Sequence, residues 1–206
     1  MLQFAVLNYI KSGGKSPARI ATEKVINSFL NEMPAIETIL DVGAKNHSQR
    51  NLLDNSQYIT CDIDSSRNVD VICDIHNLPF PDNKFDLILC IEVLEHVEKP
   101  LIAVNELYRV LNENGVVLLS TRFMFPLHPD PKDYYRFTPD SLEQVFYKFK
   151  NIEIKPAGGL LVSLLMLILH SLPGFAQKHR LFSWAGLLPT SNQTRFACGY
   201  VVKATK

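Results

Sequence analysis

The 206-residue sequence has no excess of either charge, because its 21 lysine and arginine residues balance 21 aspartate and glutamate residues. A neutral chain creates no overall field that would attract nucleic acid or an anionic membrane, although a local basic patch stays compatible with this balance. The composition, 47% hydrophobic and 20% charged, is that of a globular protein. The length fits a single domain covering residues 1–206.

Paired cysteines are also lacking. The four cysteines, Cys61, Cys73, Cys90 and Cys198, form no CxxC motif, and the first three lie in or beside strand-like runs. This spacing argues against a zinc site or a disulfide framework and suits a reducing compartment. We therefore expect no metal site and a cytoplasmic location.

No hydrophobic run is long enough to cross a membrane. The most apolar stretch, residues 160–172, has 13 residues, whereas a membrane span needs about 20. The first residues lack the basic region and the small-residue cleavage site of a secretory signal. We expect no transmembrane span.

Strand-like runs alternate with helical patterns along the chain. Ser16-Pro17 begins a helical segment that extends to Pro34, so residues 1–35 are expected to be an N-terminal helical segment. Further helical patterns cover residues 92–97, 101–111 and 138–149, and strand candidates cover residues 38–42, 58–63, 69–74, 85–91, 116–121, 151–155 and 196–204. Such alternation predicts an α/β fold, a mostly parallel, doubly wound sheet with helices on both faces. Ligands bind such sheets at the carboxyl ends of the strands.

Three carboxylates, Asp41, Asp62 and Asp74, follow or end successive strand candidates. Asp62 comes 21 residues after Asp41, close to the offset of about 20 residues at which an acid meets a ribose hydroxyl in nucleotide-binding folds. A solvated loop acid or a helix cap would explain any one of them alone. Three at successive strand ends favour a nucleoside site.

The first turn lacks the glycines of a dinucleotide site. It contains Gly43, but the two further glycines of a GxGxxG motif, which let a backbone approach a pyrophosphate, are absent. NAD and FAD are therefore disfavoured. S-adenosylmethionine has no phosphate, and carboxylates suit its diol, amine and sulfonium.

Taken together, four ordered segments resemble the type 11 branch of class I S-adenosylmethionine-dependent methyltransferases. They are ILDVGAKNHSQRNLL, YITCDIDSS, VICDIHNLPFPDNKFDLILCIEVLEHVEKP and LYRVLNENGVVLLST, within about residues 38–140. The resemblance implies a Rossmann-like, seven-stranded sheet whose last strand runs antiparallel.

The same resemblance implies roles for individual residues. Asp41, Gly43 and Ala44 would face the methionine part of the cofactor, and Asp62 would bind the ribose. In addition, Asp74 with Ile75 would bind the adenine, while Glu92 and His96 would border the methyl-transfer pocket.

A second cluster lies in residues 123–138, where His128, Asp133, Tyr134, Tyr135 and Arg136 occur among three prolines. The run resembles the HxxPxDYYRFT segment of a bacterial subgroup of these enzymes, many of which look like envelope-glycan enzymes. If the acceptor is a hydroxyl, a base must take its proton, and His96 and His128 are the candidates. Tyr134 or Arg136 would orient the acceptor. In the alternative, Tyr135 and Phe137 merely pack and Asp133 pairs with Arg136 to hold the turn.

The sequence thus predicts methyl transfer to a small-molecule or lipid-linked glycan acceptor. A non-catalytic methyltransferase-like binding module is the first alternative. It is supported by Lys45 and His47, because the family that the chain resembles usually has a glycine at the first position and often one near the second. A nucleotide-dependent oxidoreductase is disfavoured by the missing glycines, and nucleic-acid modification by the neutral charge. The apolar insert at residues 158–190 would complete the core, form an oligomer interface or touch a membrane surface.

Overall fold

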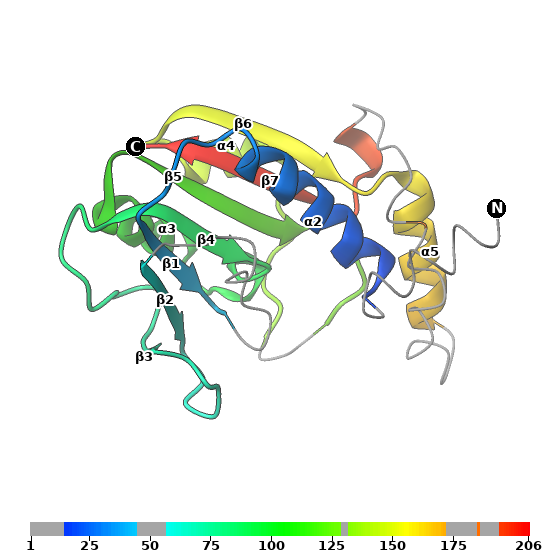
Figure 1. Ribbon diagram of the computed structural model, residues 1–206. Coiled ribbons are helices and arrows are strands. Elements are labelled where there is room, and N and C mark those ends of the chain that lie inside the picture. The colour runs from blue at the N-terminus through cyan, green and yellow to red at the C-terminus, as the bar shows by residue number, and fades with distance from the viewer. Residues whose placement is uncertain (1–14, 45–56, 129–131, 172–184, 186–193) are drawn as a thin grey trace. The chain divides into compact units, whose positions relative to one another are not determined.

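The computed structural model describes residues 15–44, 57–128, 132–171, 185 and 194–206. Seven strands form one mixed sheet in the order β3-β2-β1-β4-β5-β7-β6, with β7 antiparallel (Figure 1). The strands are β1 (Thr38–Val42), β2 (Gln57–Asp62), β3 (Val71–Ile72), β4 (Phe85–Ile91), β5 (Leu111–Arg122), β6 (Lys150–Ala157) and β7 (Gly199–Thr205). The predicted Rossmann-like α/β sheet with an antiparallel last strand is confirmed.

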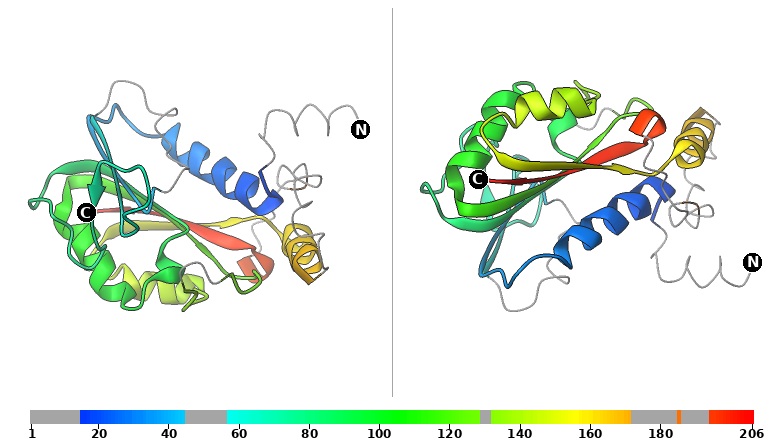
Figure 2. Two further views of the ribbon diagram at one scale, coloured as in Figure 1. Left: turned by 90° about the horizontal axis from the view of Figure 1, so that it is seen from below. Right: turned by 90° about the horizontal axis from the view of Figure 1, so that it is seen from above.

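The helices described are α2 (Pro17–Leu30), α3 (Pro100–Val110), α4 (Pro139–Val145), α5 (Leu160–Ser171) and the short 3₁₀ helices η2 (Leu94–His96) and η4 (Thr194–Phe196). Ser16 caps α2 by accepting the N–H of Arg19, as the Ser-Pro pair predicts. Thr138 caps α4 in a reciprocal capping box with Ser141. Figure 2 shows α3 and α4 side by side along one face of the sheet.

Strands β1 and β4 form the centre of the sheet and have the bounds that the sequence predicts. Their apolar side chains are buried, except for the half-buried Ile91 at the end of β4, because both faces of a parallel sheet are covered. β1 pairs in parallel with β2 on one side and with β4 on the other. The carboxyl ends of these three strands therefore meet at one edge of the sheet.

Strand β5 begins five residues earlier than the sequence predicts. The helix α3 ends at Val110, and Asn114-Gly115 lies within β5. Asn114 adopts a left-handed φ of 65°, and the pairing with β4 jumps from Phe85↔Leu111 to Leu87↔Val116. Residues 112–115 therefore form a bulge, after which the parallel register continues to the end of β4.

The chain divides into two compact units. The first, here called the pocket unit, comprises residues 33–121, 130–154 and 202–206; the second, the α2–α5 unit, comprises residues 1–32, 122–129 and 155–201. A single methyltransferase domain over residues 1–206 stays a prediction. None of the helices described is both long and apolar enough to cross a membrane.

Within the α2–α5 unit, part of the predicted apolar insert is the helix α5. Its Val162 and Met166 side chains form a small core with Ala18 of α2 and Cys198, and Phe125 packs against this core. One face of the insert thus completes a core, as one of the three interpretations of the sequence holds. Residues 172–184 and 186–190 of the insert lie outside the described residues.

Candidate functional site

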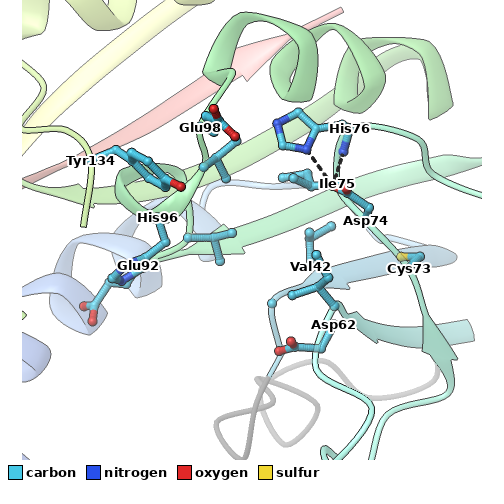
Figure 3. Close-up of a pocket in the computed structure, with 14 residues that line it drawn as sticks. Val42, Asp62, Cys73, Asp74, Ile75, His76, Glu92, His96, Glu98 and Tyr134 are labelled. Atoms are coloured by element: carbon cyan, nitrogen blue, oxygen red, sulfur yellow. Dashed lines mark hydrogen bonds and ion pairs between the residues drawn. The ribbon is translucent and has the colours of Figure 1, made fainter. Parts of the chain in front are cut away.

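A cavity of about 290 Å³ lies in the pocket unit, at the edge where β1, β2 and β4 end (Figure 3). Fourteen residues line it: Val42, Gly43, Asp62, Ile63, Cys73, Asp74, Ile75, His76, Glu92, Val93, His96, Val97, Glu98 and Tyr134. The lining includes four carboxylates, two histidines and several aliphatic side chains. No lysine or arginine is among these described lining residues.

Gly43 makes the turn at the end of β1. Its N–H donates to the carbonyl of Cys61 on β2 at 2.8 Å, and its φ of +68° lies in the left-handed region. A Cβ placed here would approach Cγ2 of Val93 to 2.4 Å. Only glycine therefore fits between the two strand ends and the cavity wall.

Asp62 ends β2 and is 7% exposed. Its Oδ1 accepts the backbone N–H of Asp64 at 3.0 Å, which holds the carboxylate at the cavity wall. Figure 3 shows Asp62 and Asp74 on the same side of the cavity, from neighbouring strand ends. Both acids therefore line the same cavity.

Asp74 forms a local pair with His76 two residues later. Its Oδ1 accepts both the backbone N–H of His76, at 2.9 Å, and the ring Nδ1 of His76, at 2.6 Å. Burial alone would raise the pKa of Asp74, but these two hydrogen bonds and the imidazole charge outweigh it and lower the pKa. Because a carboxylate oxygen only accepts, the Nδ1 of His76 carries the proton.

Glu92 follows β4 in an uncommon backbone conformation. Its φ of 58° is left-handed, which costs a residue with a Cβ about 1–2 kcal/mol. Its N–H donates to the carbonyl of Ser120 on β5 at 2.9 Å, which holds the strained turn in place. The turn carries the Glu92 side chain to the cavity, an arrangement typical of functional sites.

The fully buried Glu95 precedes the cavity residue His96 and fixes the residues around it by hydrogen bonds. Its Oε2 accepts the hydroxyl proton of Thr121 on β5 at 3.0 Å. Its backbone carbonyl accepts the N–H groups of Tyr134, at 2.8 Å, and of Tyr135, at 3.3 Å. Glu95 thereby ties the Tyr134 segment to the turn that follows β4.

His96 and Tyr134 lie together at the cavity (Figure 3). The ring Nδ1 of His96 hydrogen-bonds the backbone carbonyl of Lys132. A carbonyl cannot donate, so Nδ1 carries the proton and the neutral ring has its lone pair on Nε2. This tautomer is the one that a general base at Nε2 requires.

The neighbouring loop residues fit the packing alternative. Asp133 and Arg136 form a two-point ion pair, and the hydroxyl of Tyr135 donates to the carbonyl of Glu98 at 3.0 Å. These contacts hold the loop that presents Tyr134. The structural role expected for the Asp133–Arg136 pair is therefore present.

Three residues predicted for the site do not line the cavity. Asp41 is buried within β1, where its Oδ2 accepts the hydroxyl proton of Tyr58 at 2.7 Å. Ala44 is buried just after Gly43. His128 belongs to the α2–α5 unit, where its ring packs against Phe125.

Lys45 and His47 lie outside the described residues. The prediction missed Cys73, His76 and Glu98 among the polar cavity residues. Only their positions, directly beside Asp74 and the EVLEH motif, would have pointed to them.

This set of side chains fits S-adenosylmethionine better than a phosphate-bearing cofactor. Four carboxylates and no lysine or arginine line the described cavity, which favours a cationic ligand and repels a pyrophosphate. Asp62 has acceptors for a diol, and Asp74 with Ile75 offers a polar edge beside an apolar wall for a purine. The glycine at position 43 leaves room for a ligand close to the backbone.

Comparison with known families supports the same interpretation. A methyltransferase domain model matches residues 40–119, which include β2, β4, the end of β1 and most of the cavity lining. Residues 40–119 thus match a methyltransferase domain, and the solved structures described next share the class I methyltransferase fold. The resemblance predicted from the motifs is confirmed, and this family implies S-adenosylmethionine as the cofactor.

Solved structures and curated proteins resemble this methyltransferase domain. A SAM-dependent methyltransferase from Archaeoglobus fulgidus has a TM-score of 0.64 at 14% identity, over 92% of this chain and 94% of that one. A tRNA U34 carboxymethyltransferase of Campylobacter curvus is 34% identical over 93 residues, 39% of this chain and 31% of that protein. An uncharacterized methyltransferase of Schizosaccharomyces pombe is 38% identical over 60 residues, 29% of this chain and 22% of that protein. The chain thus spans less than a third of the curated relatives it matches.

Proposed function

We propose that the protein transfers a methyl group from S-adenosylmethionine to a small-molecule or lipid-linked glycan acceptor. The observation that carries the proposal is the convergence of Asp62, Asp74, Glu92 and His96 on one cavity without a lysine or arginine in its described lining. These residues come from three strand ends that the methyltransferase domain match covers.

Each acid has a distinct role in this proposal. Asp62 accepts hydrogen bonds from the ribose diol, and Asp74 with Ile75 contacts the adenine. Glu92 and the Gly43 turn meet the methionine part of the cofactor. Asp41 and Ala44 support the Gly43 turn without lining the cavity. Both residues are buried, and Asp41 is hydrogen-bonded to Tyr58.

The cofactor supplies a methyl group bound to a sulfonium, and the neutral thioether that remains after transfer is a good leaving group. The protein therefore contributes mainly alignment and exclusion of water. His96 takes the proton of an acceptor hydroxyl at Nε2, because its Nδ1 is committed to the Lys132 carbonyl. Tyr134, presented beside it by the Glu95 carbonyl, orients the acceptor.

His128 is the second candidate base. Because His128 does not line the cavity, comparing its substitution with that of His96 tests which histidine is the base. We expect His96→Ala to lower turnover at least tenfold while leaving the Kd for S-adenosylmethionine within about threefold, since a general base contributes about 10²- to 10⁴-fold. If His128→Ala lowers turnover and His96→Ala does not, the roles are reversed.

The decisive experiment is calorimetric titration with S-adenosylmethionine, S-adenosylhomocysteine and NAD. The proposal expects a micromolar Kd for the first two and no response to NAD. NAD binding alone would overturn it. Binding of S-adenosylmethionine without methylation of hydroxylated small molecules, lipid-linked glycans or tRNA would favour the non-catalytic binding module instead.

A further inference from the structure

Helix α5 of the α2–α5 unit is apolar on both sides, although only one side packs. Val162, Ser163, Met166 and Leu169 are buried. The opposite stripe consists of Leu160, Leu161, Leu164, Leu167 and Ile168, which are between 38% and 55% exposed. A surface helix ordinarily exposes polar residues to solvent. An exposed aliphatic stripe of this kind is typical of an interaction surface.

A neighbouring segment of the same unit also exposes a large apolar side chain. The Ser163 hydroxyl donates to the carbonyl of Phe196 at 2.9 Å, which places η4 beside α5. The Phe196 side chain is itself 42% exposed. Six large apolar side chains are therefore exposed on these two adjoining helices.

The unit that carries the stripe is basic although the whole chain is neutral. Its described residues include six lysines and arginines and two acids: Lys15, Arg19, Lys24, Arg122, Lys155 and Arg195 against Glu23 and Glu32. The sequence from Lys155 to Val201 contains no aspartate or glutamate at all. Lys15 and Lys24 are exposed on or next to α2, which packs against α5, and Arg195 is exposed beside Phe196.

We propose that this stripe docks on an anionic phospholipid bilayer, with α5 lying in the plane of the membrane. An aliphatic helix face on a unit that is basic among its described residues fits an interfacial helix, and each basic residue near an anionic leaflet adds attraction. Twelve residues make a helix of about 18 Å, too short to cross a hydrocarbon core of about 30 Å.

Two other occupants fit less well. A protein partner would favour aromatic and arginine anchors, whereas the five residues of the stripe on α5 are all leucine or isoleucine. A second copy of the chain would bring together two units that are both basic among their described residues, and like charges repel.

The test is sedimentation of the full chain with vesicles. One set contains phosphatidylcholine alone, and the other contains phosphatidylcholine and phosphatidylglycerol at about 3:1, both at low salt. We expect binding to the anionic vesicles, which 0.5 M sodium chloride weakens because salt screens exposed charges. No binding to anionic vesicles, or equal binding to both sets, would overturn the proposal.

Substitutions distinguish binding through this stripe from non-specific adsorption of the protein to vesicles. The triple substitution Leu161→Gln, Leu164→Gln and Ile168→Gln should lower the vesicle partition coefficient at least tenfold. A matched control, Leu101→Gln with Ile102→Gln, changes two equally exposed apolar residues on α3 of the pocket unit and should leave it unchanged.

Charge and assembly complete the test. Lys24→Glu with Arg195→Glu should weaken anionic binding at least fivefold, whereas Lys148→Glu with Lys150→Glu in the pocket unit should not. All variants should keep the Kd of the parent chain for S-adenosylmethionine, which shows that they fold and keeps this proposal independent of the proposed function. A dimer that the triple substitution converts to a monomer, measured by light scattering, would assign the stripe to a second copy and refute lipid docking.

Discussion

Replacing Asp62 by asparagine tests the cofactor site most sharply, because the two side chains have the same shape. The Oδ1 of Asp62 already accepts the Asp64 N–H at 3.0 Å. Asparagine has a single acceptor oxygen, which that N–H would continue to use, so at least one hydrogen bond from the ribose diol is lost. A hydrogen bond to a charged group contributes about 1.5–3 kcal/mol, which corresponds to a Kd about 10- to 150-fold weaker.

Calorimetric titration measures this change for both S-adenosylmethionine and S-adenosylhomocysteine. The loss should be equal for the two ligands, because they share the ribose. Asp64→Asn is the matched control, since Asp64 is two residues away and its side chain does not line the cavity. A Kd for Asp62→Asn within threefold of the parent, or an equal loss in Asp64→Asn, would refute the ribose assignment.

Three further changes test the surrounding frame. Gly43→Ala should lower the unfolding free energy in urea by at least about 2 kcal/mol, from its left-handed φ and its clash with Val93; adding Val93→Ala should recover part of it, and full stability of Gly43→Ala would contradict the geometry. Glu92→Gly should keep the unfolding free energy or raise it by up to about 1 kcal/mol, because glycine relieves the left-handed φ. It should nevertheless weaken S-adenosylmethionine binding as much as Glu92→Gln does. A large loss of stability would show that the turn is not strained. Asp86→Ala should cost about 1–3 kcal/mol, because the Asp86 carboxylate accepts the N–H and hydroxyl of Thr38 at the start of β1.

Asp86 also gives the folded state a pH dependence. Burial alone would raise its pKa, but hydrogen bonds from Asn112, Thr38 and Glu37 outweigh burial and lower it. Since its pKa is lower in the folded chain, its contribution is complete above the unfolded pKa of about 3.9 and disappears as the pH falls through the folded value. Asp86→Ala should therefore lose less stability at pH 3 than at pH 7, and an equal loss at both would contradict this.

The sequence predicted the centre of the sheet better than its edges. β1 and β4 have the predicted bounds because continuous apolar runs flanked by polar residues identify strands buried on both faces. The predicted strand at residues 69–74 shrinks to Val71–Ile72, an edge strand with pairing on one side only. The Phe196 end of the last predicted strand forms η4 instead, and β7 begins at Gly199.

The site was predictable where strand ends determine it and not where local hydrogen bonds do. Asp62 and Asp74 reach the cavity because parallel strands end at one edge. Asp41 follows the same rule, but its carboxylate instead accepts the hydroxyl of Tyr58, a contact that depends on the register of β2. His76 enters the cavity wall through its bond to Asp74, which no spacing rule encodes.

The bulge at residues 112–115 can absorb a change in the length of β5 without moving the residues at the site. Beyond it, Val116 to Ser120 pair with β4 in continuous register, and the Ser120 carbonyl holds the N–H of Glu92. An inserted residue between Asn112 and Gly115 would therefore enlarge an existing irregularity and leave the Glu92 turn where it is. This point of β5 is a suitable place to introduce a probe or a spectroscopic label without disturbing ligand recognition.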